Sequence, residues 1–402
     1  MRNRALTATA VGLSAALLVS GCSSSGGGSK KTSSGSGGGG GKASAACKLA
    51  NPPTSAAKAP SGSGATGKAS GKVGVILPDT TSSTRYNLYD KPLLQKALTA
   101  AGITPDIQNA GGDVGKYKSI AQSMIGEGIK VLIMDSIDAS SGAAVEQTAT
   151  KAGVKVIDYD RVNLGGSGQY YVSFDNEDVG KLQAQTMVDC LNQDGVKKPK
   201  ILMMDGGTDV DNNAVLFAKG AHSVLDPLKA AGKLTIASES VVKGWDVNNA
   251  APTFTQALTA DGKVDGVLAA NDDIANAVIG VLKKNSAAGK VVVTGQDSGT
   301  EGLQNIVNAQ QSMTIFKNVK LEANAAAQLA IALIKGQAPS TSGLTLSPFA
   351  DPKNPSHKIS ALLLPAVVIT QANVSDVIKA GALTKAEVCK GIASACAKAG
   401  VN

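Results

Sequence analysis

Short apolar runs alternate with longer amphipathic stretches from Lys72 to the end of the chain. The apolar runs are strand candidates at 73–77, 131–134, 154–157, 201–204, 267–270 and 291–293. The amphipathic stretches between them are helix candidates at 93–101, 117–127, 145–152 and 182–191. Nearly continuous apolar strands separated by helices predict parallel sheets that are covered on both faces. About 330 residues exceed one comfortable core, so we predict two doubly wound α/β lobes.

The beginning of the chain follows a different pattern. Arg2 and Arg4 precede a small-residue and apolar stretch at 5–19, which is too short for a comfortable membrane span and is typical of an export signal. The stretch ends in Leu18-Val19-Ser20-Gly21-Cys22, which resembles a bacterial lipobox. We therefore predict a signal peptide at 1–21 and acylation of Cys22. A plain secretory signal with an incidental cysteine is the alternative.

Residues 22–71 contain no aromatic side chain and consist largely of Gly, Ser, Ala, Lys and Pro. Such a segment cannot bury enough apolar surface to offset its chain entropy, so we predict a disordered tether. Two glycine patterns, Gly62-x-Gly64-x-x-Gly67 and Gly62-x4-Gly67-Lys68, resemble a dinucleotide fingerprint and a phosphate loop. Both sites require a preceding strand and a following helix. These patterns precede the first strand candidate, so we predict no nucleotide site.

The net charge of the chain belongs to the export signal and the tether. The whole chain has 39 Lys and Arg and 31 Asp and Glu, a formal charge of +8. No acidic residue occurs before position 72, but eight basic residues do: Arg2, Arg4, Lys30, Lys31, Lys42, Lys48, Lys58 and Lys68. The body is therefore neutral overall, which argues against a nucleic acid partner. The tether lysines could contact an anionic membrane.

Polar side chains gather where the predicted strands end. In open parallel sheets, ligands bind beyond the carboxyl ends of the strands. These ends read Leu77-Pro78-Asp79, Asp158-Tyr159-Asp160-Arg161, Asp205-Gly206-Gly207, Ala270-Asn271-Asp272-Asp273 and Gly295-Gln296-Asp297. For any single position, a turn former or a helix cap is the alternative. Five such ends together favour a binding rim.

The scarce aromatic side chains stand close to this rim. The chain has 5 Phe, 6 Tyr and 1 Trp; Tyr86 follows Arg85 after the first strand, and Trp245 follows Lys243-Gly244. A sugar needs paired donors and acceptors for adjacent hydroxyls, which Asp, Asn and Arg supply. It also needs an aromatic face for its C–H side. Packing between the lobes is the alternative use of these rings.

The body resembles the type I periplasmic sugar-binding proteins, in the branch of the D-xylose-binding proteins. The resemblance runs from about Lys72 to Ala382. Its most specific blocks are Asp158-Tyr159-Asp160-Arg161, Val172-Ser173-Phe174-Asp175-Asn176-Glu177, Val210-Asp211-Asn212-Asn213-Ala214, Gly244-Trp245, Ala270-Asn271-Asp272, Gly295-Gln296-Asp297 and Met313-Thr314-Ile315-Phe316-Lys317. It implies two lobes that close over one monosaccharide, xylose or a related pentose or hexose. It also implies a monomeric, lipid-anchored extracytoplasmic receptor that serves an ABC transporter permease and has no cofactor.

The resemblance assigns ligand contacts to specific residues of this chain. The hydroxyl ligands would be Arg85, Asp160, Arg161, Asn271, Asp297 and Lys317. Tyr86 and Trp245 would stack on the ring, and one of Asn212 and Asn213 would add a ligand, with Asn213 favoured. The D-xylose-binding proteins have Arg-Trp where this chain has Arg85-Tyr86, which leaves the exact sugar open. Alanine at Trp245 or Asp297 is expected to weaken binding without changing the stability of the empty protein.

The resemblance also implies how the body is divided. Lobe 1 would comprise 72–174 with 299–361, and lobe 2 would comprise 175–298 with 362–402. Three crossings between the lobes are expected near 174–176, 296–298 and 362–365.

The residues argue against catalysis and against a metal site. The chain has two histidines: His222 in a predicted helix and His357 in a Pro-rich loop, so no Ser-His-Asp set is apparent. Each acid of the rim stands beside an amide or an arginine, unlike the carboxylate pair of a glycosidase. The near calcium loop Asp209-x-Asp211-x-Asn213 has Ala214 and Gly220 where Gly and Glu are required. We predict neither an enzyme nor a metal site.

Four cysteines remain besides Cys22: Cys47, Cys190, Cys389 and Cys396. Along an unbroken helix, Cys389 and Cys396 would lie about 10 Å apart, too far for a disulfide. A break at Gly391 would bring them together, and export makes a bond plausible. Free thiols, or bonds to Cys47 or Cys190, are the alternatives.

A repressor, a signalling receptor and an exported enzyme are the alternatives to a transport receptor. A transcriptional repressor of this fold would need a helix-turn-helix at its N-terminus, where this chain has an export signal. A receptor that signals to a membrane kinase stays open as the alternative. An exported enzyme is disfavoured because no nucleophile set is present.

Overall fold

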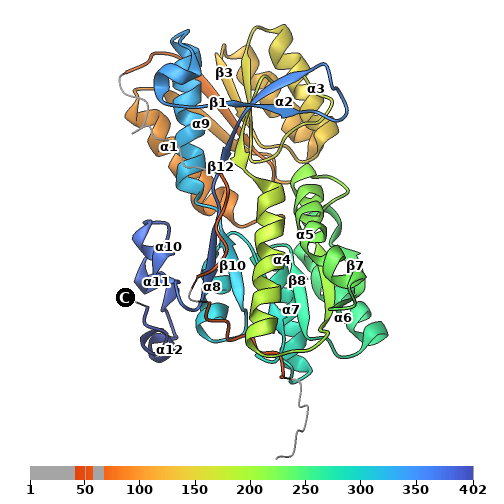
Figure 1. Cartoon of the computed structure of the whole chain (residues 1–402). Coiled ribbons are helices and arrows are strands. Elements are labelled where there is room, and N and C mark those ends of the chain that lie inside the picture. The colour runs from red at the N-terminus through yellow and green to blue at the C-terminus, as the bar shows by residue number, and fades with distance from the viewer. Residues whose placement is uncertain (1–40, 50, 58–67, 402) are drawn as a thin grey trace, which may run out of the picture. The chain divides into compact units, whose positions relative to one another are not determined.

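The computed structural model describes residues 41–49, 51–57 and 68–401, which belong to one compact unit (Figure 1). The predicted signal peptide at 1–21, Cys22 and much of the predicted tether lie outside the described residues. The described chain forms two α/β lobes with parallel sheets, so the predicted fold class is confirmed. No helix of the described part is long and apolar enough to cross a membrane.

Lobe 1 is built on a seven-stranded sheet in the order β11-β12-β5-β4-β3-β1-β2. Its strands are β1 (Lys72–Leu77), β2 (Thr104–Asn109), β3 (Val131–Met134), β4 (Lys155–Tyr159), β5 (Tyr170–Phe174), β11 (Ser347–Ala350) and β12 (Lys358–Leu364). Neighbouring strands are parallel except for the antiparallel pair β11 and β12. The helices of this lobe are α1 (Lys91–Ala100), α2 (Val114–Gly126), α3 (Ala139–Lys151) and α9 (Val319–Ile334).

Lobe 2 contains a four-stranded parallel sheet and a separate antiparallel strand pair. The sheet has the order β7-β6-β8-β9, with β6 (Lys200–Asp205), β7 (Thr235–Val241), β8 (Gly266–Ala269) and β9 (Val292–Val293). The pair is β10 (Met313–Phe316) with β13 (Val367–Thr370). The helices are α4 (Asn176–Gln193), α5 (Asn212–Ala230), α6 (Ala250–Asp261), α7 (Asp272–Lys284), α8 (Thr300–Val307), α10 (Ser375–Lys379), α11 (Lys385–Val388) and α12 (Ala393–Lys398).

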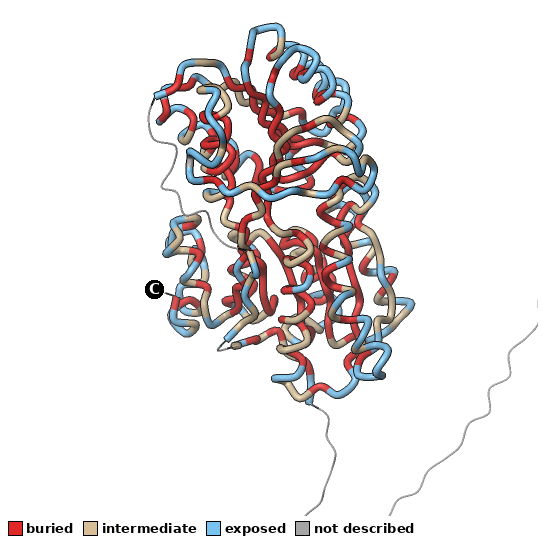
Figure 2. The backbone as a smooth tube through the Cα atoms, turned by 45° about the horizontal axis from the view of Figure 1, so that its top comes forward, coloured by how far each residue is buried: buried red, intermediate tan, exposed pale blue. Residues whose placement is uncertain are grey.

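Alternation along each strand explains why both faces of the sheets are covered. In β3, Val131 and Ile133 pack into one apolar cluster, whereas Leu132 and Met134 pack into the cluster on the opposite face. All four side chains are buried, as Figure 2 shows for the strands inside each lobe. A strand that is apolar on both faces requires helices on both sides, which is the arrangement of a parallel α/β sheet.

Within residues 68–401 the chain crosses between the lobes three times. It passes from β5 to α4 at Phe174–Asn176, from β10 to α9 at Phe316–Val319, and from β12 to β13 at Leu364–Val367. The predicted crossing at 296–298 is wrong. Asp297 N–H donates to Ile315 O (2.8 Å), so the chain stays in lobe 2 at that point and leaves it one strand later.

The predicted boundary of lobe 1 at 299 is wrong for the same reason. Leu303 and Ile306 of α8 pack with Phe316 and Ile369 in one apolar cluster of lobe 2. The strand β10 pairs with β13 of the same lobe. Residues 299–316 therefore belong to lobe 2, and lobe 1 takes up the chain again only at α9.

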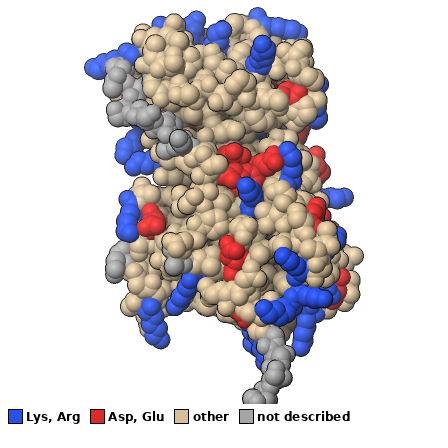
Figure 3. Space-filling view, in the orientation of Figure 1, with Lys and Arg blue, Asp and Glu red and all other residues tan. Residues whose placement is uncertain are grey.

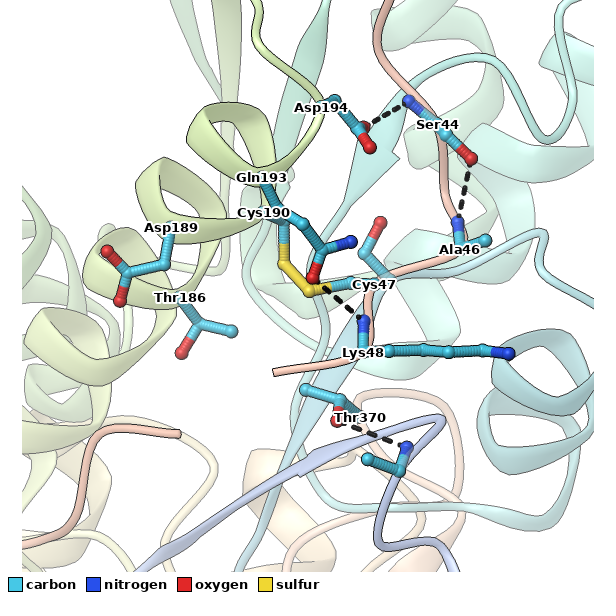
Figure 4. The surroundings of a disulfide bond; sticks show 12 residues. Ser44, Ala46, Cys47, Lys48, Thr186, Asp189, Cys190, Gln193, Asp194 and Thr370 are labelled. Carbon is cyan, nitrogen blue, oxygen red and sulfur yellow. Dashed lines mark hydrogen bonds between the residues drawn. A yellow bond between two sulfur atoms is a disulfide. The ribbon is translucent and has the colours of Figure 1, made fainter. Parts of the chain in front are cut away.

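The predicted disordered tether is wrong for residues 41–49 and 51–57, which we call the N-terminal strap. Cys47 forms a disulfide with Cys190 of α4, 143 positions away in sequence. Ser44 N–H donates to Asp194 Oδ2 (2.6 Å), and Lys48 N–H donates to Gln193 Oε1 (3.4 Å) (Figure 4). The strap is therefore held along lobe 2, although the strand that follows it, β1, lies in lobe 1.

The other end of the strap lies beside the crossings. Thr54 forms an antiparallel bridge with Val367, the first residue of β13. Ser55 Oγ–H donates to Asp178 Oδ2 (2.7 Å) in the first turn of α4. The strap therefore contacts both ends of α4.

The C-terminal helices α10 to α12 pack on lobe 2, where Val377, Val388 and Cys396 join the cluster that contains α8. Cys389 and Cys396 are joined by a disulfide with a Cα–Cα distance of 5.9 Å. Gly391 has a φ of 76°, a left-handed conformation that favours glycine, and it ends the helical path between the two cysteines.

Candidate functional site

A cavity lies where the carboxyl ends of strands from both lobes meet. Its lining comprises Ser82, Ser83, Arg85, Tyr86, Asp160, Arg161, Asp211, Asn213, Phe217, Trp245, Asn271, Gln296, Asp297 and Lys317. Lobe 1 supplies the loop after β1 and the turn after β4. Lobe 2 supplies the start of α5, the loop after β7 and the ends of β8 and β9. Its position fits a small-molecule site of an α/β protein.

Nine of the ten predicted ligand residues line this cavity; Asn212 is the exception. Asn213 turns toward the lobes' junction, where its Nδ2–H donates to Asp160 O (2.9 Å) and its Oδ1 accepts from Asn176 Nδ2 (2.8 Å). Asn212, the first residue of α5, is half-buried outside the lining. The two side chains diverge because consecutive residues of a helix project about 100° apart.

Five lining residues were not predicted: Ser82, Ser83, Asp211, Phe217 and Gln296. Asp211 caps α5 by accepting from Asn213 N–H (2.8 Å). Because a cap alone explains an aspartate before a helix, its place in the cavity lining was not predicted. Phe217 follows Asn213 by one helical turn on α5, a spacing that could have revealed it. Gln296 lies inside a predicted strand-end block, beside the residue that was chosen.

The lobe 1 wall is organised around Arg85, whose side chain is 3% exposed. Its guanidinium bonds Asp90 (2.8 Å), Glu322 (2.5 Å) and Asp160 (3.3 Å). Burial disfavours the charged guanidinium, but these three carboxylates outweigh that effect and raise the pKa of Arg85 well above its ordinary value. The charge of Arg85 is therefore fixed in the empty site.

Asp160 is the acidic residue that links the cationic groups of the cavity. Burial would raise its pKa, but Arg85, Lys317 and Arg161 outweigh burial and lower the pKa to about 2. Lys317 Nζ lies 3.6 Å from Asp160 Oδ1 and 3.5 Å from Asp297 Oδ1. Because Lys317 stands at the β10 to α9 crossing, this network spans the two lobes.

Three lining residues that are not glycine have a positive φ: Asp160 (60°), Trp245 (59°) and Asp297 (88°). This conformation is unfavourable for most side chains and is held only where the surrounding structure enforces it. Each of the three follows a strand end or a loop that faces the cavity. Backbone strain is therefore concentrated where side chains must be aimed at a common point.

The lobe 2 wall is aromatic. Trp245 is 5% exposed and packs edge-on against Phe217, with ring centroids 6.3 Å apart. Its Nε1–H donates to Asp211 Oδ2 (3.0 Å). A Cβ on Gly206 would lie 2.1 Å from Cη2 of Trp245, so the indole requires glycine at that position. The ring is therefore fixed before any ligand arrives.

The opposite aromatic face comes from lobe 1. The hydroxyl of Tyr86 donates to Asp160 Oδ2 (3.4 Å), and the guanidinium carbons of Arg85 and Arg161 lie 5.7 and 5.8 Å from its ring centroid. Tyr86 is 2% exposed. Two rings from different lobes thus border a polar space.

The charged groups of the lining balance. Arg85, Arg161 and Lys317 are cationic, and Asp160, Asp211 and Asp297 are acidic. No group of three or more His, Cys, Asp or Glu placed to hold a metal ion occurs in the part of the chain that the structure describes. A charge-balanced, donor- and acceptor-rich cavity with aromatic walls suits an uncharged, hydroxyl-rich ligand.

Comparison with known proteins agrees with this architecture. Residues 73–338 match the model of the periplasmic binding protein domain. The D-xylose-binding periplasmic protein of Escherichia coli (strain K12) is 34% identical over 312 residues, 77% of this chain and 90% of that protein. The multiple sugar-binding periplasmic receptor ChvE of Rhizobium radiobacter is 33% identical over 334 residues, 80% of this chain and 92% of that protein.

A solved structure supports the same relationship. The carbohydrate transporter solute-binding protein of Chloroflexus aurantiacus, in complex with D-glucose, is 30% identical and covers 79% of this chain and 98% of its own, with a TM-score of 0.71. The chain therefore belongs to the type I periplasmic sugar-binding proteins, in the branch of the D-xylose-binding proteins.

Proposed function

We propose that this protein is a lipid-anchored extracytoplasmic receptor that binds one uncharged monosaccharide between its lobes and delivers it to the permease of an ABC transporter. The observation that carries the proposal is the charge-balanced cavity lined by both lobes, with an aromatic ring on each side. A ligand that contacts both walls favours the closed state over the open one, which is how such a receptor would signal its loaded form.

Unused polar atoms in the cavity support a hydroxyl-rich ligand. Asp297 Oδ1, Gln296 Oε1 and Arg161 Nε are buried and have no hydrogen-bond partner, although Asp297 Oδ1 and Arg161 Nε lie in ion pairs at 3.5 and 3.4 Å. Buried polar atoms without partners are costly and rare. Two acceptors from the loop after β9 and one donor from the loop after β4 would be satisfied by the hydroxyls of a single sugar ring.

Binding without catalysis fits the state of the charged groups. Arg85 and Asp160 are paired with fixed partners, and their pKa values are shifted toward permanent ionisation. A general acid or base needs a pKa near the working pH. We therefore assign the lining groups to ligand recognition.

Calorimetric titration of the compact unit, residues 40–402, against a panel of pentoses and hexoses tests the assignment. The relatives bind D-xylose or D-glucose by their names, so both belong in the panel. We expect one-to-one binding to at least one aldose and none to charged sugar phosphates. Absence of binding to every neutral sugar would refute the proposal.

Asp297→Asn should isolate one ligand contact. The change keeps the size of the side chain and tolerates the positive φ, but it removes the charged acceptor. Loss of a charge-assisted hydrogen bond lowers affinity by roughly ten- to a hundred-fold. Because Asp297 is 17% exposed and its ion-pair partner Lys317 keeps Asp160 as a second counterion, the unfolding midpoint should stay nearly constant.

The matched control for this measurement is Asp205→Asn. Asp205 also ends a strand of lobe 2, but it lies outside the cavity lining. Calorimetry should give the parent affinity for Asp205→Asn. Equal losses in both variants would show that Asp297 acts through the fold.

The lipid anchor has its own test, because Cys22 lies outside the described residues. Cys22→Ala should move the full-length protein from the membrane fraction to the soluble fraction of fractionated cells. The reason is that a diacylated cysteine supplies the two chains that stable anchoring requires. Mass spectrometry of the mature N-terminus provides the direct measurement, and an unmodified cysteine there would contradict the anchor while leaving the sugar assignment intact.

A further inference from the structure

We propose that the end of lobe 2 at which the N-terminal strap begins is a docking surface for the anionic phospholipid headgroups of the membrane. We call this surface the basic pole. It consists of the loops that precede β6, β7, β8 and β9, together with residues 41–48 of the strap. Its exposed lysines are Lys42, Lys48, Lys197, Lys198, Lys229, Lys233, Lys263, Lys283, Lys284 and Lys290.

Hydrogen bonds hold these loops side by side. Gly41 N–H donates to Gly195 O (2.9 Å), and Ala45 N–H donates to Gly289 O (3.2 Å). Thr235 N–H donates to Pro199 O (2.9 Å), which joins the loops before β6 and β7. The lysines of different loops therefore share one surface, and basic side chains gather over the lower end of this lobe in Figure 3.

The acidic residues of the same loops offset only part of this charge. They are Asp194, Asp261 and Asp265, and all three are partly buried. Asp194 accepts from Ser44 N–H, and Asp265 accepts from Lys200 N–H (2.9 Å). The protein is neutral over its body as a whole, but its charge is distributed unevenly, and the basic pole carries a local excess.

Charge alone does not single out this surface. Lysines are favourable near helix C-termini, and lobe 1 also exposes Lys130, Lys151 and Lys155 at its corresponding end. The basic pole has a further feature. It contains a groove of about 660 Å³ with Val188, Leu191, Val196, Leu228 and Leu234 in its lining.

The groove combines apolar and cationic groups in the way that an interfacial site requires. Lys197, Lys198 and Lys233 belong to the same lining as the five aliphatic side chains. Lysine stems lie along apolar surface while their ammonium groups reach the polar phase. Headgroup phosphates and the upper acyl region present both kinds of partner within one bilayer interface.

The strap indicates from which end of lobe 2 the N-terminal sequence leaves the lobe. Cys47 is bound to Cys190 at the basic pole (Figure 4). Gly41, the first described residue, donates its N–H to Gly195 O at the same pole. The sequence that leads back to Cys22 therefore starts from this end of lobe 2. The choice of a membrane as the partner rests on the proposed lipid anchor, whereas the affinity for headgroups does not require it.

Vesicle sedimentation with residues 40–402, which carry no acyl group, tests the inference. The probes are vesicles of phosphatidylcholine alone and vesicles in which half of the lipid is phosphatidylglycerol. We expect binding to the anionic vesicles only, and loss of that binding at high salt. Each lysine near an anionic surface strengthens partitioning roughly five-fold, so Lys197→Glu/Lys198→Glu/Lys233→Glu should weaken it at least about a hundred-fold.

The matched control is Lys130→Glu/Lys151→Glu/Lys155→Glu, which makes the same charge change on lobe 1. It should retain most of the vesicle binding, and both variants should keep the sugar affinity of the parent because no changed residue lines the cavity. Equal losses in the two variants, or no loss in the first, would overturn the assignment to the basic pole. Binding to soluble polyglutamate without binding to anionic vesicles would overturn the lipid as partner. Neither readout depends on the identity of the sugar.

Discussion

Replacing Asp160 by asparagine is expected to lower the free energy of unfolding by about 3–5 kcal/mol and to weaken sugar binding strongly. The carboxylate stands against Arg85, Lys317 and Arg161, so its loss removes the one counterion that these three buried cations share. Asparagine is the suitable replacement because it has the same size and tolerates the φ of 60°. Urea unfolding of the empty protein measures the first effect, and calorimetry measures the second.

The same residue predicts a dependence on pH. Asp160 has a folded-state pKa of about 2, below the usual value for the unfolded chain. Its contribution to stability is therefore complete above about pH 4 and is lost as the pH falls toward 2, amounting to roughly 2 kcal/mol. The Asp160→Asn variant should lack this part of the acid-induced loss.

Asp135 is the matched control for Asp160. Both carboxyls are buried near Arg161, but burial and the charge of Asp160 raise the pKa of Asp135 well above its ordinary value. The surroundings of Asp135 therefore disfavour its charged form, and Asp135→Asn should change the free energy of unfolding much less. Equal destabilisation by the two substitutions would contradict the charge argument.

Replacing Trp245 by alanine is expected to abolish measurable sugar binding and to lower the free energy of unfolding by about 3–5 kcal/mol. The indole is buried in the apolar cluster of lobe 2, contacts Phe217 and donates to Asp211. This corrects the expectation from sequence that alanine there would leave the empty protein unaffected. Thermal and urea unfolding without sugar provide the measurement.

Trp245→Phe separates the packing of Trp245 from its hydrogen bond. Phenylalanine fills much of the space under Gly206 but leaves Asp211 Oδ2 without the Nε1–H donor. The expected loss in unfolding free energy is about 1–2 kcal/mol, and partial sugar binding should remain. An empty Trp245→Ala protein as stable as the parent would show that the ring serves the ligand alone.

The sequence predicted much of the cavity lining because strand ends carry a local signal. Asp160, Arg161, Asn271 and Asp297 each follow an apolar run, and parallel strands bring such ends to one edge. Asn212 shows the limit of this reasoning. Which of two adjacent amides enters the cavity depends on where α5 begins, and the cap that decides it is Asp211.

The crossing from lobe 2 to lobe 1 could not be located in the same way. Residues 295–297 follow a predicted strand, and a chain can leave its lobe at such a strand end. The decisive interaction is the pairing of β10 with β13, which joins Met313 to Thr370 and has no local signal. Long-range pairing therefore moved the crossing to Phe316–Val319.

The ordered N-terminal strap was not predicted because the prediction for this segment relied on its composition alone. Ala43 and Ala45 are buried, but two small side chains bury too little area to order a chain alone. The disulfide of Cys47 compensates by restricting the unfolded ensemble across a long loop. The one feature of the sequence that could have indicated an ordered segment here was Cys47, which can form a disulfide.

The strap also determines how mechanical load enters the molecule. A pull on the N-terminal end of the chain reaches Cys47 first and passes through the sulfur–sulfur bond into the last turn of α4. The first strand of lobe 1 follows only after Ala57, so the force is carried by lobe 2 alone. If the proposed lipid anchor holds the protein at the cell surface, traction through it would bypass the hinge between the lobes and would not bias their opening and closing.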